Sequence, residues 1–84
     1  MEYSKARGKL PSELDGLLAS QIITAINEAN LGLSDSTIAR RYLVDRLPQV
    51  DIAAELGLER STVTKRMRDI RPRVSSAAHK MFPQ

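Results

Sequence analysis

The sequence predicts an all-α protein, a small bundle of four to five helices, and three observations support this. Apolar residues recur at spacings of three and four over most of the chain, which is the period of a helix. No stretch alternates polar and apolar residues with period two, so we expect no sheet. The chain has 84 residues, 42% of them hydrophobic, which suffices for one compact core but not for two.

The first part of the chain is expected to hold a flexible N-terminal lead, residues 1–10, followed by a helix. Ser12 is a candidate N-cap for this helix, whose apolar residues span 14–29. Gly16 lies inside the pattern and weakens the first turn, and Asn30–Gly32 is typical of a helix end. We expect the apolar face of this helix to pack into the core, with pairing to a second copy of the chain as the alternative.

Two shorter helices are expected next. The second helix is predicted to begin after Ser34 or Ser36. Pro48 interrupts it and is compatible with the first turn of a third helix. This third helix is predicted to be about eight residues long and to stop at Gly57, because glycine readily takes the left-handed conformation that ends helices.

A fourth helix is predicted to begin near Glu59 or Arg60 and to end or kink before Pro72, because the residue preceding a proline disfavours the helical conformation. The helical domain is therefore expected to span residues 11–74. Residues 75–84 are expected to form a C-terminal tail or a short helix.

Composition excludes several classes of function. There is no cysteine, so no disulfide framework, thiolate metal site or cysteine nucleophile can form. The single histidine, His79, is expected to be exposed, and Asp51 and Glu55 are expected to form a solvated helix face rather than a metal pair. We expect no enzymatic activity, no metal and no cofactor. No apolar run approaches the length of a membrane span or of a secretory signal.

The net charge of +3 is concentrated in one segment. Residues 1–42 carry five basic and five acidic residues, whereas residues 60–73 carry six basic residues and one acidic residue. A basic block in an otherwise balanced chain indicates a localised anionic partner. The three aromatic residues all lie outside this block, so base stacking on single strands is disfavoured and a duplex is favoured.

Residues 49–68 meet the requirements of a helix-turn-helix. Two short helices joined by a tight turn need a small residue where they cross, and Ala53 supplies it. The turn needs a residue that can adopt a positive φ, and Gly57 supplies that. Leu58 supplies a turn residue that points inward. Val63 is expected to pack the fourth predicted helix against the third. The second helix of such a motif enters the major groove of DNA.

The fourth predicted helix, which is the second helix of the motif, is expected to bury an apolar stripe formed by Val63, Met67 and Ile70. The side opposite this stripe is expected to contact DNA. The exposed donors on it are Arg60, Ser61, Thr64, Lys65 and Arg68, which suit guanine edges and phosphates. Arg66 and Arg71 flank this face and are expected to touch the DNA backbone. Gln49, at the start of the third helix, is expected to present its backbone amide to a phosphate.

Residues 34–74 resemble the region-4 domain of bacterial sigma factors and are similar to the DNA-binding domain of LuxR-type regulators. The resemblance rests on Ile52–Leu58 and Ser61–Ile70, preceded by the helix that begins at Ile38. It implies four short helices that bind promoter DNA, with contacts by the same exposed donors and with Glu59 near the N-cap. Glu59 stands where such domains often have Ser or Thr, which implies a weaker cap.

The sequence therefore predicts a stand-alone sigma-like protein that binds double-stranded DNA specifically, regulates transcription and is cytoplasmic and nucleoid-associated. Two alternatives remain open at this point. One is a protein-interaction module that docks on RNA polymerase or on another regulator. The other is an accessory protein of phage DNA packaging or recombination.

Overall fold

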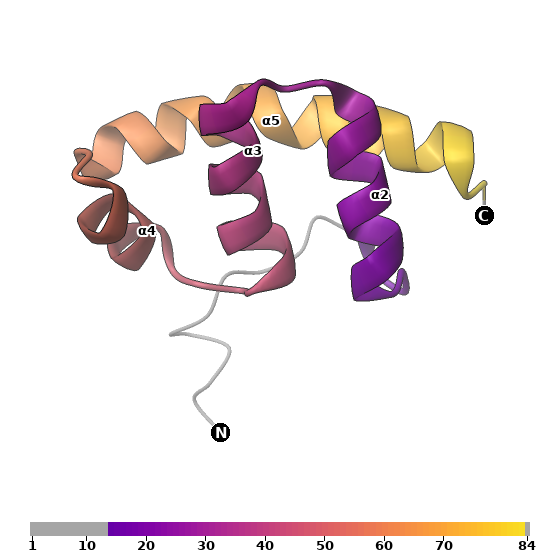
Figure 1. Cartoon of the computed structure of the whole chain (residues 1–84), viewed down its shortest axis with the longest axis horizontal. Helices are drawn as coiled ribbons and strands as arrows, with labels where there is room; N and C mark the ends of the chain where they lie inside the picture. The colour runs from indigo at the N-terminus through magenta and orange to yellow at the C-terminus, as the bar shows by residue number, and fades with distance from the viewer. Residues whose placement is uncertain (1–13, 84) are drawn as a thin grey trace.

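The computed structural model describes residues 14–83, and these residues are all-α, with no strand among them. Figure 1 shows the long helix α5 (Arg60–Met81) running along the molecule, with α2 (Ala19–Ala29) and α3 (Leu33–Ala39) lying across it. The short helix α4 (Gln49–Leu56) lies beside the N-terminal end of α5. The predicted fold class is confirmed.

Helix α2 begins later than the sequence predicts. Gly16 has φ +94°, a conformation that interrupts a right-handed helix, so the apolar residues before it are not part of α2. Leu18 is extended, and its N–H donates to Oε1 of Gln21 at 2.8 Å, which satisfies one free amide at the helix start. The predicted cap Ser12 lies outside the described residues. The predicted end is confirmed, because Asn30 adopts the left-handed conformation with φ +55°.

Helix α3 begins at Leu33, slightly before the predicted start, and continues without a break into a π-helical turn, η2 (Arg40–Val44). The wider turn is visible in the hydrogen bond from the Asp45 N–H to the Arg40 carbonyl at 3.0 Å, which spans five residues. Tyr42 and Leu43 are both buried in this turn. The α3–η2 segment therefore packs against the core, and the chain then turns towards α4.

Helix α4 and the turn after it match the sequence prediction. Pro48 occupies the N-cap position of α4, and Gly57 ends it with φ +69°. The N–H of Leu58 donates to the Ala53 carbonyl at 2.8 Å, which closes the helix end as glycine-terminated helices commonly do. Three residues, 57–59, then separate α4 from α5.

Helix α5 does not end at Pro72, and this corrects the sequence prediction. It continues to Met81, so residues 75–81 are its last turns rather than a tail or a separate helix. Pro72 removes one backbone hydrogen bond, but Val74, Ala77 and Ala78 beyond it are buried. Burial of this second half against α2 offsets the local cost.

One core holds the helices together. Its largest fully buried side chains come from the segment before α2 and from every helix: Leu14, Ile26, Ile38, Leu43, Ile52, Val63, Met67, Ile70 and Val74. Ile22, Ala25 and Ile26 of α2 are buried within the chain. The expectation that the apolar face of this helix packs into the core is therefore confirmed.

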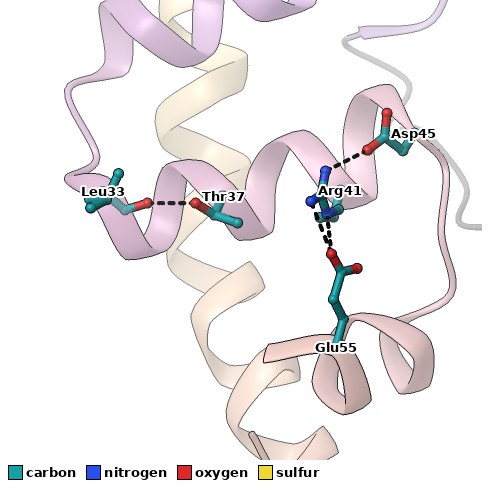
Figure 2. Close-up of polar contacts among 5 residues, drawn as sticks. All are labelled: Leu33, Thr37, Arg41, Asp45 and Glu55. Atoms are coloured by element: carbon teal, nitrogen blue, oxygen red, sulfur yellow. Dashed lines mark hydrogen bonds and ion pairs between the residues drawn. The ribbon is translucent and has the colours of Figure 1, made fainter. Parts of the chain in front are cut away.

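A polar clasp at Arg41 ties α4 to η2. Its guanidinium lies 2.9 Å from Oε2 of Glu55 in α4 and 3.1 Å from Oδ2 of Asp45, and Figure 2 shows the arginine between the two carboxylates. Both hydrogen bonds raise the pKa of Arg41 above its ordinary value, and the bond to Glu55 has the larger effect. The clasp fixes the last turn of α4 relative to the rest of the bundle.

Candidate nucleic-acid interface

The first half of α5 is oriented by its apolar stripe. Val63, Met67 and Ile70 are all buried against the other helices, as the sequence predicts. Because a helix turns about 100° per residue, this stripe determines which side chains face away from the protein.

The outward side of this half forms a basic face, which we define as Arg60, Ser61, Thr64, Lys65 and Arg68. Thr64 is half-buried and the other four side chains are exposed. The same five residues line one shallow depression on the surface. The structure thus brings together five of the eight residues predicted to contact DNA, those expected on the exposed side of this helix.

The three cations of the basic face have no side-chain partner among residues 14–83. Among residues 14–83, Arg60, Lys65 and Arg68 make no side-chain hydrogen bond or ion pair. A free guanidinium or ammonium can bind an external anion without first breaking an internal contact. Two of the three are arginines, which can bind a phosphate or a guanine edge with two hydrogen bonds.

The flanking arginines Arg66 and Arg71, which the sequence predicts to touch the DNA backbone, both have partners among residues 14–83. Nη1 of Arg66 lies 2.8 Å from Oδ1 of Asp35 in α3. The guanidinium of Arg71 lies over the ring of Tyr42, 5.8 Å from its centroid, within the range of a cation–π contact. Both side chains are engaged with the α3–η2 segment, so their charges are partly compensated inside the protein.

Gln49 is joined to the basic face through its side chain. The hydroxyl of Thr64 lies 2.6 Å from Oε1 of Gln49, and both residues are half-buried. The sequence analysis assigned Gln49 a role for its backbone amide and missed this contact. Nothing in the local sequence signals it, because the two residues are 15 positions apart and meet only when α4 packs on α5.

A second depression lies between α2 and the second half of α5. It is lined in part by Glu28, Arg73 and Lys80, so it presents an acid beside two bases. Arg73 also lies 3.5 Å from the carboxylate of Asp69. This mixed charge suits a polyanion less well than the basic face does.

The acidic and histidine side chains of the described residues are dispersed rather than clustered. Within residues 14–83 no group of three or more such side chains could hold a metal ion. Asp51 and His79 are exposed, as expected, and Glu55 is held by Arg41.

Comparison of the chain with family models, with curated proteins and with solved structures gives no match. None of the helices between residues 14 and 83 has the combination of length and apolar character that crossing a membrane requires.

Proposed function

We propose that this protein binds double-stranded DNA sequence-specifically and regulates transcription, through a helix-turn-helix like that of sigma region 4. In this proposal α4, the turn at Gly57 and the first half of α5 form the helix-turn-helix. The basic face enters the major groove, and the protein works in the cytoplasm on the nucleoid. The observation that carries the proposal is the set of three cations on one exposed face of a helix that have no side-chain partner among residues 14–83.

The dimensions of the basic face suit the major groove. It extends from Arg60 to Arg68, eight residue steps, which at about 1.5 Å per step is roughly 12 Å. The major groove of B-DNA is about 12 Å wide and admits an α-helix, whose diameter with side chains is about 10–12 Å. The second half of α5, beyond Pro72, then lies outside the groove, where it carries the core contacts with α2.

The composition of the basic face favours a duplex over other anionic partners. Ser61 places an exposed hydroxyl group among three cations, and this mixture suits both phosphates and base edges. The aromatic residues of the described chain, Tyr42 and Phe82, lie away from the face. Single-stranded nucleic acid is commonly held by stacking on such rings.

The test is to remove the three cations together. We expect an R60A/K65A/R68A variant to keep its helical circular dichroism spectrum and to lose binding to duplexes selected by the wild-type protein from a random pool. The matched control is R40A/R73A/K80A, which removes the same charge from other exposed positions. It should retain most of the affinity, because its cations lie off the basic face.

A folded triple variant that binds the selected duplexes as tightly as the wild type would overturn the proposal. Equal losses in both triple variants would also contradict it, because binding would then follow net charge alone. The symmetry of the selected motif reports whether one copy or a homodimer is bound, since two-fold dimers read palindromic sites.

A further inference from the structure

Thr64 differs from its neighbours on the basic face. Its side chain is half-buried, and its hydroxyl oxygen lies 2.6 Å from Oε1 of Gln49 and 3.2 Å from the carbonyl oxygen of Arg60. Ser61 and Lys65, by contrast, are exposed and make no side-chain hydrogen bond or ion pair among residues 14–83. Thr64 therefore faces the α4–α5 junction rather than open solvent.

The proton of the Thr64 hydroxyl is already used inside the protein. A hydroxyl has one proton to donate, and both of its neighbours, the Gln49 side-chain oxygen and the Arg60 carbonyl, can only accept. The acceptors on a guanine edge, O6 and N7, need a donor. The Thr64 hydroxyl therefore has no free proton to donate to O6 or N7, whereas the guanidinium of Arg68 has no partner among residues 14–83.

The same contact leaves the other end of the Gln49 side chain available. Because Oε1 of Gln49 accepts from Thr64, its amide nitrogen is directed away from that hydroxyl and keeps both N–H donors. This nitrogen has no partner among residues 14–83. Gln49 is the first residue of α4, beside the basic face rather than on it.

We infer that Thr64 is a positioning residue that acts through Gln49. Its hydroxyl holds the Gln49 carboxamide in one orientation. In that orientation the free N–H groups of Gln49 bind a phosphate oxygen of the duplex, and the rest of the basic face reads the bases. The inference rests on the DNA-binding function proposed above. A phosphate is the chosen acceptor because Gln49 lies beside the helix that enters the groove.

The contact also completes the attachment of α4. The clasp of Arg41 on Glu55 holds the last turn of α4, and the contact of Thr64 with Gln49 holds its first residue. Held at both ends, α4 presents Gln49 at a fixed distance from the basic face before DNA arrives. Such preorganisation lowers the entropy lost on binding.

The experiment is a double-mutant cycle on DNA affinity in the full chain. Fluorescence anisotropy would measure the Kd of a wild-type-selected duplex for the wild type, T64V, T64S, Q49A and Q49A/T64V, well below the melting temperature of each. Valine keeps the branched shape of threonine without the hydroxyl, and serine keeps the hydroxyl. A selection repeated with T64V would give its base preferences.

We expect T64V to weaken binding by roughly three- to tenfold, the fold-change that corresponds to one hydrogen bond. The Kd of T64S should remain within about twofold of the wild-type Kd, because serine keeps the hydroxyl. The double variant should bind no more weakly than Q49A alone, because Thr64 acts only through Gln49. The base preferences of T64V should equal those of the wild type.

Three results would overturn the inference while leaving DNA binding itself in place. These are unchanged affinity in T64V, losses in T64V and Q49A that multiply in the double variant, and a changed base preference at one position in T64V. A wild-type protein that binds no duplex at all overturns the proposed function and this inference together. The wild-type arm alone therefore distinguishes the two failures.

Discussion

Nη1 of Arg66 lies 2.8 Å from Oδ1 of Asp35, an ion pair that joins α5 to the first turn of α3. The carboxylate is also favoured by its place near a helix N-terminus. Two residues further along α5, Arg68 has no partner among residues 14–83. Two arginines of the same basic segment therefore have different tasks, one in the protein's own structure and one available for an external anion.

This difference predicts different consequences for R66A and R68A. We expect R66A to lower the free energy of unfolding by about 0.5 kcal/mol, typical of a partly exposed ion pair, and to change DNA affinity little. R68A should change the free energy of unfolding by less than about 0.5 kcal/mol. It should lower the affinity for DNA by roughly tenfold. Urea denaturation and anisotropy titrations measure the two quantities, and an equal loss of affinity in both variants would contradict the assignment.

The salt dependence of binding should report the number of phosphates that the protein neutralises. For the wild type we expect a slope of log K against log salt of roughly −4 to −6. The R60A/K65A/R68A variant should lose up to about 0.9 of slope for each cation that touches a phosphate, or about 2.7 for three. A cation that binds a base edge contributes less. Titrations at several salt concentrations measure the slope, and an unchanged slope would exclude all three as phosphate ligands.

The second half of α5 should be essential to stability. Val74 lies beyond Pro72 and is fully buried, so we expect V74A to cost roughly 1–3 kcal/mol of unfolding free energy. The exposed neighbour Ser76 supplies the control, and S76A should change stability by less than about 0.5 kcal/mol. Urea denaturation gives both values. Equal stability of V74A and the wild type would mean that this half of the helix is not part of the core.

Gly57 should be constrained by its backbone alone. Its φ is +69°, and a Cβ built there meets no atom within 4 Å. We therefore expect G57A to cost about 1–2 kcal/mol through conformational strain, whereas G57N should cost less because asparagine tolerates the left-handed region. Asn30 already adopts it at the end of α2. Thermal denaturation compares the two, and equal losses would show that steric contact rather than backbone strain is limiting.

Local signals explain why much of the fold could be predicted. Pro48 and Gly57 determine the start and the end of α4 through their own backbone preferences, whatever the rest of the chain does. The buried stripe that begins at Val63 then determines the exposed side of α5, because helix geometry leaves no other choice. The composition of the basic face follows from these two facts.

Local signals failed where long-range packing decides. Pro72 predicts an end to the helix, but burial of Val74 against the core prolongs it. The pattern before Ala19 predicts an earlier helix start, but Gly16 adopts a positive φ and Leu14 packs into the core from outside α2. At Pro72 the free energy of burial outweighs a local cost of about 3 kcal/mol, whereas at Gly16 the low helix propensity of glycine, about 1 kcal/mol, prevails over the apolar pattern.

The sequence by itself determined an all-α chain, the turn at Gly57 and the side of α5 that carries Arg60, Lys65 and Arg68. Each of these depends on residues close together in the chain. Only the tertiary structure decided that Arg66 pairs with Asp35 and that Thr64 holds Gln49. Those partners are 31 and 15 residues apart, and a contact at such separation exists only after the helices have packed into one core.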